Sequence, residues 1–230
     1  MSLSKTLALD VSSKTGYALF EDDKLVEYGL IKLPNKIVSY GFYPAGFLAA
    51  AIFQIDQLMV LIRRVRADRI LIEETNPGGR AARYDQKYLE YLHALLMDRV
   101  LPEQLGTVHY ISSSDWRNAL GLKLDKAQRK NNQKASAAGV KGTCMDCLGR
   151  PRRACQKCKG TGKLKASAKD RAAAKAVAGV KGKITVKHLA VEHVNAAFNL
   201  GFKIKDNDVA DAICLKMAFD LGVRFCEGKG

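Results

Sequence analysis

Hydrophobic and polar residues follow two different rhythms along the first part of the chain. Short apolar runs at residues 5–10, 16–20 and 24–33 predict three strands, and the acidic turn between the last two makes them an antiparallel meander. Between residues 43 and 66 apolar side chains recur every three or four positions, which predicts a helix. The chain therefore opens with three strands and one amphipathic helix.

Further along, strands and helices alternate. A strand is expected at residues 68–74 and another at 106–112, while helical spacing predicts helices at 84–100, 116–120 (capped by Ser114 or Asp115), 186–200 and 206–223. Strands followed by alternating units predict an α/β fold, a mixed sheet with helices on both faces.

Positive charge is concentrated in one segment. The 230 residues carry a net charge of +15, and residues 123–187 hold 19 of the 38 Lys and Arg residues but only 3 of the 23 acids. A clustered basic segment is typical of a protein that binds a polyanion such as nucleic acid. A solvated Lys-rich stretch without a partner is the alternative.

The same segment is poor in large apolar residues, which predicts two domains. Residues 1–122 and 184–230 form the core domain, and residues 123–183 form a basic insert. The insert is flanked by two Lys- and Ala-rich stretches, each a possible basic helix or arm. Each stretch closes with Gly-Val-Lys-Gly, at residues 139–142 and 179–182, which we expect to act as hinges.

Two cysteine pairs in the insert predict a zinc site. Two C-x2-C pairs separated by seven residues supply four thiolates for one structural Zn²⁺, with no position left for water; these are Cys144, Cys147, Cys155 and Cys158. The second pair, CQKCKGTG, resembles one repeat of a DnaJ-type Cys-rich domain. Disulfides are disfavoured in an intracellular chain. Cys214 falls in an apolar helical pattern and is expected in the core, and Cys226 has no assigned role.

Four acids lie at the ends of predicted elements. Asp10 ends the first strand, Glu73 or Glu74 ends the fourth, and Asp208 and Asp211 share one face of the last helix. Carboxylates gathered in this way repel one another unless cations neutralise them, and oxygen ligands suit Mg²⁺ or Mn²⁺. Two such ions about 4 Å apart support phosphoryl displacement. The alternative for the two helix acids is a cap and a favourable interaction with the helix dipole.

Three segments carry a resemblance to a known family. LALDVSSKTGYALF, ILIEE and DNDVADAI together resemble the RuvC-like branch of the RNase H superfamily, and the insert makes the chain more similar to phage-type relatives. The resemblance implies a five-stranded sheet in the order 3-2-1-4-5. It also implies that Asp10, Glu73, Asp208 and Asp211 are catalytic metal ligands. Such enzymes are homodimeric resolvases that cut four-way DNA junctions, so we expect a structure-selective DNA endonuclease that uses two metal ions.

The sequence departs from the family pattern at several positions. Val11 and Ser12 replace the usual Pro-Gly after the first acid, and Asn76 stands where the family often has an aromatic residue that probes the junction. Tyr84 or Tyr88 is the candidate substitute. The Ile-Glu of the family favours Glu73 over its neighbour, and strand alternation lets only one of the two point into the site.

Arginines are the predicted contacts to DNA. A basic loop after the fourth strand and the tip between the cysteine pairs present cations that suit phosphates; they are Arg80, Arg83, Arg150, Arg152 and Arg153. We expect these residues to contact the backbone of branched DNA rather than to recognise its bases.

Other functions remain as alternatives. A ribonuclease acting on RNA–DNA hybrids would use the same acids, and a non-catalytic zinc-dependent binder of nucleic acid could use the same fold. A sugar-kinase or actin-like chain would need a second phosphate loop, which the sequence lacks. We find no signal peptide and no apolar run of the roughly 20 residues that span a bilayer. We therefore expect no membrane association and a cytoplasmic protein, in a bacterial host if phage-encoded.

Overall fold

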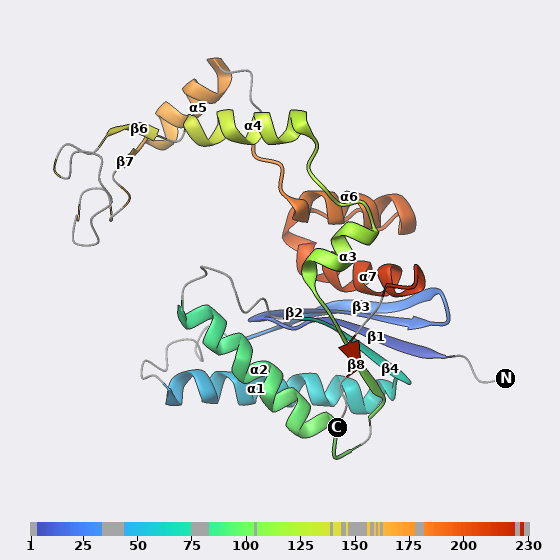
Figure 1. The fold of residues 1–230 in the computed structure, drawn as a ribbon. Helices are drawn as coiled ribbons and strands as arrows, with labels where there is room; N and C mark the ends of the chain where they lie inside the picture. The colour runs from blue at the N-terminus through green and yellow to red at the C-terminus, as the bar shows by residue number, and fades with distance from the viewer. Residues whose placement is uncertain are drawn as a thin grey trace. The chain divides into compact units, whose positions relative to one another are not determined.

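The computed structural model in Figure 1 describes most of the chain. It describes residues 4–33, 44–74, 83–103, 105–138, 140–143, 146, 156, 159, 161, 163–177, 182–223 and 226–227, and only the backbone of 83–85, 141–143 and 226–227. The chain divides into two compact units. One unit comprises Met1–Lys123 with Lys187–Gly230, and the other comprises Leu124–Val186.

The first unit is built on a mixed sheet. Its strands are β1 (Lys5–Asp10), β2 (Lys14–Glu21), β3 (Lys24–Lys32), β4 (Arg69–Glu73), β5 (Thr107–Ile111) and β8 (Cys226–Glu227), in the order β3-β2-β1-β4-β5-β8. The first three strands are antiparallel, whereas β1, β4 and β5 run parallel to one another. The expected order 3-2-1-4-5 is therefore confirmed.

Helices cover both faces of this sheet (Figure 1). They are α1 (Ala45–Val65), α2 (Arg83–Val100), α3 (Ser113–Ala119), α6 (Val186–Phe198) and α7 (Asn207–Asp220), with a 3-10 turn at Ile204–Asp206. Leu7 and Leu9 of β1 share one apolar cluster with α1 and α2. Because side chains alternate along a strand, Ala8 and Asp10 belong to the opposite face, where α7 packs against β1 and β2. Asp10 thus faces the α7 side.

The structure corrects the predicted elements in two places and confirms one burial prediction. The short strand β8 pairs antiparallel with β5 and adds a sixth strand to the expected five. Helix α3 begins at Ser113, and its cap is Ser112, whose side chain accepts a hydrogen bond from the backbone N–H of Asp115. Cys214 is fully buried, as predicted.

Helix α1 differs from the expectation that no segment is long and apolar enough to cross a bilayer. By length and composition alone its 21 residues could span a membrane, and half of its most apolar stretch is buried inside the protein. Ile55, Leu58 and Ile62 pack in the core between the sheet and α2. Helices buried in a protein core pass the same test of length and composition.

The second unit contains two helices and a strand pair. These are α4 (Lys126–Ala137), β6 (Val140–Thr143), β7 (Lys163–Lys165) and α5 (Ala168–Val177), with β6 and β7 antiparallel. Both basic stretches that flank the cysteines are therefore helical. The first Gly-Val-Lys-Gly lies largely in β6, so its prediction as a hinge is wrong. Thr143 pairs with Lys163, so the two ends of the segment between these residues lie side by side.

A glycine on β2 sets how closely α7 approaches the sheet. A Cβ atom added to Gly16 would lie 2.0 Å from the carbonyl oxygen of Asp208 and 2.7 Å from the backbone nitrogen of Val209. Both obstacles are backbone atoms at the start of α7, which cannot move without the helix. Gly16 therefore permits a contact that any side chain would prevent.

We predict that Gly16→Ala destabilises the protein by about 3 kcal/mol, because α7 must move away from the strand. Gly29→Ala is the matched control, since the three atoms nearest to its Cβ would all belong to the side chain of Tyr17, which can move, and not to the backbone. We expect the control to cost less than about 1 kcal/mol. Urea unfolding measures both, and equal stability of the two variants would contradict the role of Gly16.

Candidate active site

Asp10 and Glu73 lie side by side at the ends of adjacent parallel strands. Leu9 of β1 pairs with Ile72 of β4, and each acid is the next residue on its strand. Because alternation places Glu73 on the same face as Leu71, it points to the α7 side, as Asp10 does. The next residue, Glu74, has left the strand and is exposed, with its backbone N–H bound to the Ile111 carbonyl.

Helix α7 brings the other two acids to the same place. Asp211 is 2% exposed, whereas Asp208, in the first turn, is partly exposed. The charges of Asp208 and Asp211 both act on Asp10, so the four carboxylates form one electrostatic cluster. Neither acid is the N-cap of α7, a position held by Asp206 without a side-chain cap bond. The structure therefore brings all four predicted site residues together.

Two cations that no sequence motif predicts lie beside these acids. An amino nitrogen of Arg117, on α3, lies 3.5 Å from an oxygen of Glu73 and 3.7 Å from one of Asp211. The Lys187 Nζ, on α6, lies 3.4 Å from an oxygen of Asp208. These ion pairs join residues that are far apart in the sequence, so they cannot be found from local sequence patterns.

Trp116 contacts both an acid and a cation of the cluster. Its fully buried indole donates a hydrogen bond of 3.2 Å from Nε1 to Glu73, and the guanidinium of Arg117 lies 4.6 Å from its ring centre. One short helix therefore orients a carboxylate and a cation of the same site.

Burial raises the pKa values of Asp10, Glu73 and Asp211. Desolvation is the main cause for Asp10, whose pKa is well above its ordinary value, and the charges of Glu73, Asp211 and Asp208 add to it. Burial also raises the pKa of Glu73, opposed by Arg117 and the Trp116 hydrogen bond. For Asp211, burial and then Glu73 raise the pKa to about 7. These groups would ionise more readily if a further cation joined them.

The donor set suits a hard divalent cation. One carboxylate oxygen of Asp211, Oδ1, is buried without a hydrogen-bond partner among the described residues. Carboxylate oxygens are the ligands that Mg²⁺ and Mn²⁺ prefer. Over the described part of the chain, however, no three His, Cys, Asp or Glu side chains are arranged to hold a metal ion. Arg117 and Lys187 pair with the acids in this arrangement, and the expected two ions remain a prediction.

A buried polar network fixes the loop that follows Asp10. The Tyr88 hydroxyl donates to Gln54 Oε1 at 2.7 Å, and Gln54 Nε2 donates to Thr15 Oγ1 at 2.8 Å and to the Ser12 carbonyl. Gln54 and Thr15 are 1% exposed or less. Tyr88 is itself buried, so its prediction as a junction-probing aromatic is wrong. The atypical loop Val11–Thr15 is thus anchored from α1 and α2.

The remaining predicted site residues lie outside what the structure describes. No placement is given for Arg80, the three arginines Arg150, Arg152 and Arg153, or the four cysteines Cys144, Cys147, Cys155 and Cys158, and only the backbone of Arg83 and Tyr84 is described, in α2. Their assignment to DNA and zinc stays a prediction.

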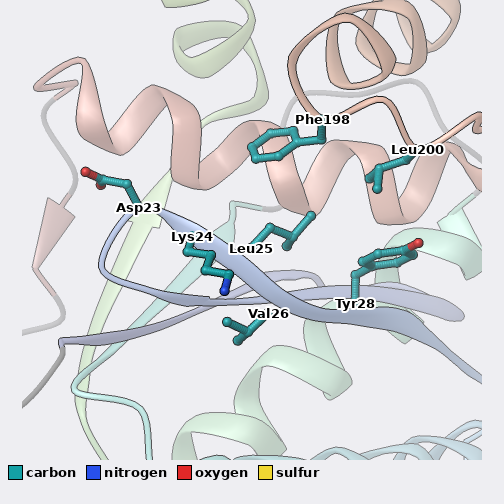
Figure 2. Close-up of a pocket in the computed structure, with 7 residues that line it drawn as sticks. All are labelled: Asp23, Lys24, Leu25, Val26, Tyr28, Phe198 and Leu200. Carbon is teal, nitrogen blue, oxygen red and sulfur yellow. The ribbon is translucent and has the colours of Figure 1, made fainter.

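The pocket in Figure 2 is separate from the acid cluster. Its volume is about 270 Å³, and it is lined by Leu25, Val26 and Tyr28 of β3 together with Phe198 and Leu200. Asp23 and Lys24 complete the lining, and none of the four site acids contributes to it. The pocket is mainly apolar, with Asp23 as the one carboxylate in its lining.

Three solved structures are similar to this chain. RuvC of T. thermophilus in complex with a Holliday junction substrate is 8% identical over 97% of this chain and 99% of that chain, with a TM-score of 0.47. Another Thermus thermophilus RuvC structure is 9% identical over 97% and 99%, with a TM-score of 0.44. The yeast mitochondrial Holliday junction resolvase Ydc2 is 14% identical over 96% and 79%, with a TM-score of 0.43. No protein-family model and no curated protein matches the sequence.

We predict that Asp211→Asn stabilises the metal-free protein at pH 8. The native pKa of about 7 exceeds the ordinary 3.8, so the native state binds this proton more tightly than the unfolded chain does. The protein therefore loses stability as the pH rises from about 4 through 7, and the amide avoids this loss. We expect a gain on the order of 2–4 kcal/mol, from about 1.4 kcal/mol per pKa unit.

Denaturant unfolding in EDTA between pH 4 and pH 8 measures this effect. Asp56→Asn, on the exposed side of α1, is the control for removal of one charge. A stability profile of Asp211→Asn parallel to that of the wild type would show that Asp211 is ionised without cost.

Proposed function

We propose that this protein is a metal-dependent, structure-selective DNA endonuclease, and specifically a Holliday junction resolvase. The observation that carries the proposal is the gathering of Asp10, Glu73, Asp208 and Asp211 from three distant segments, with one oxygen of Asp211 buried and unpartnered. Buried carboxylates that repel one another are costly to fold, so their presence favours a function that needs them.

The four acids would hold two Mg²⁺ or Mn²⁺ ions. Bound there, such ions activate water and stabilise the charge that develops on the attacking and leaving oxygens of a phosphodiester. Asp10 and Glu73 supply oxygens from the rigid strand ends, and Asp211 supplies its unpartnered Oδ1 from α7. Asp10 and Glu73 are partly exposed, which leaves the cluster open to a substrate phosphate.

Arg117 and Lys187 complete the proposed chemistry. In the arrangement described, each neutralises acids of the cluster. Cations beside such a site attract a phosphate group and stabilise its negative charge. Trp116 keeps Arg117 in place through the contact between its ring and the guanidinium.

The basic insert supports nucleic acid as the substrate. Residues 123–187 carry most of the net charge, which suits a phosphate backbone. Within that insert we also propose one structural Zn²⁺, held by Cys144, Cys147, Cys155 and Cys158. The pairing of Thr143 with Lys163 supports this, because it brings together the two ends of the cysteine segment. Junction resolution further needs paired cuts, so we propose that the protein acts as a homodimer.

We predict that the wild-type protein nicks four-way junctions symmetrically with Mg²⁺ or Mn²⁺, and cuts matched flap, duplex and RNA–DNA hybrid substrates much more slowly. Asp10→Asn and Glu73→Gln should each lower the cleavage rate at least about a thousandfold, because each removes a metal ligand worth several kcal/mol. Binding of the junction should change less than about threefold, since counterion release from phosphates dominates affinity.

Glu74→Gln is the matched control, because the neighbouring carboxylate is exposed beyond the end of β4. It should retain wild-type cleavage. Cleavage of the hybrid alone would instead favour a ribonuclease. Junction binding without cleavage under any metal would favour the non-catalytic alternative.

We predict that the purified full chain contains one zinc ion and that Cys155→Ser removes it. A small segment without an apolar core obtains its folding energy from the metal, so this variant should also bind the junction more weakly. Elemental analysis and a binding titration measure both effects, with Cys226→Ser as the control. A zinc-free wild-type protein would refute the site.

A further inference from the structure

Helix α4 of the second unit has two opposed faces. Four cations, Lys126, Arg129, Lys130 and Lys134, are exposed, and the helix contains no acid. At about 100° per residue, these four side chains occupy an arc of about 140°. The charge on this helix is therefore gathered on one side and is not spread around it.

The opposite face of α4 is fixed to the chain that returns from α5. Asn132 forms two hydrogen bonds with the backbone of Ile184, accepting at 2.8 Å and donating through Nδ2, and Asn131 Nδ2 donates to the Gly182 carbonyl at 2.7 Å. Ala135, on the same face, is 4% exposed. These contacts fix the rotation of the helix about its axis, so the cationic face points to solvent.

The spacing of the lysines suits a nucleic-acid strand. Lys126, Lys130 and Lys134 are four residues apart, so they form one row that rises about 12 Å along the helix. One strand of duplex DNA advances about 3.4 Å per nucleotide along its axis. A row of about 12 Å therefore runs along about three nucleotide steps of one strand.

Helix α5 offers a contrast within the same unit. It also carries three cations, Lys169, Arg171 and Lys175, together with Asp170. Only Arg171 and Lys175 are four residues apart, Lys169 lies about 120° around the helix from Lys175 and about 160° from Arg171, and no residue of this helix is buried. Helix α5 therefore presents no row of three cations at four-residue spacing, and no buried side chain fixes its rotation.

We propose that the cationic face of α4 is a docking surface for the phosphate backbone of double-stranded DNA. Lys126, Lys130 and Lys134 each contact a phosphate, and Arg129 flanks the row. This rests on the proposed function and adds to it the surface on which a DNA arm is held. Since the contacts are made to phosphates, they add affinity without sequence preference.

The test compares two triple variants of the full-length protein. One carries Lys126→Gln, Lys130→Gln and Lys134→Gln, and the other carries Lys169→Gln, Arg171→Gln and Lys175→Gln. Both remove three positive charges from the same unit, and glutamine is close to lysine and arginine in helix propensity. Binding of a labelled four-way junction and of a linear duplex is measured in EDTA over a range of KCl concentrations.

We expect the α4 variant to bind about 10–100-fold more weakly at 0.15 M KCl. The slope of log affinity against log salt should fall by about 2–3, because each lost phosphate contact removes about 0.9. The α5 variant should keep its slope within about 0.5 of the wild type. Both variants should cleave with Mg²⁺ at saturating protein concentration, since neither changes the acid cluster.

Two results would overturn the proposal while leaving the nuclease function intact. One is an unchanged salt slope in the α4 variant, and the other is an equal loss in both variants, which would indicate diffuse charge. Absence of DNA binding by the wild-type protein would overturn the docking surface and the proposed function together.

Discussion

The backbone contact between Gly16 and the start of α7 is the constraint on which the site depends. Because position 16 has no side chain, the carbonyl of Asp208 can lie directly against β2. Helix α7 is buried from Val209 to Lys216, so its packing energy holds Asp211 opposite the ends of β1 and β4. A strand, a neighbouring parallel strand and a distant helix thereby bring their carboxylates to one place.

The cost of that arrangement is electrostatic. Four carboxylates with two nearby cations have a formal charge of −2 when all are ionised, and burial makes each charge harder to keep. The raised pKa values of Asp10, Glu73 and Asp211 reflect this electrostatic cost. A divalent cation would relieve it, which connects the packing of α7 to the proposed metal chemistry.

The sequence predicted the parts of the site that belong to regular patterns. Asp10 and Glu73 close apolar strand runs, and helical spacing places Asp208 and Asp211 on one face. That the strand acids and the helix acids form one site was implied by the resemblance to the RuvC-like family. Arg117 and Lys187 could not be found in this way, because an ion pair across the fold leaves no periodic signal. The burial of Tyr88 depends on Gln54 of another helix, and β8, at two residues, is too short to show alternation.

The central claim is that the acid cluster holds divalent metal ions, and anomalous scattering from crystals grown with Mn²⁺ tests it most directly. We expect Mn²⁺ peaks between the acids, with the Oδ1 atom of Asp211 among the ligands and Arg117 no longer paired with that residue. Crystals with no Mn²⁺ peak in the cluster, and with Arg117 still paired to Glu73 and Asp211, would contradict the claim.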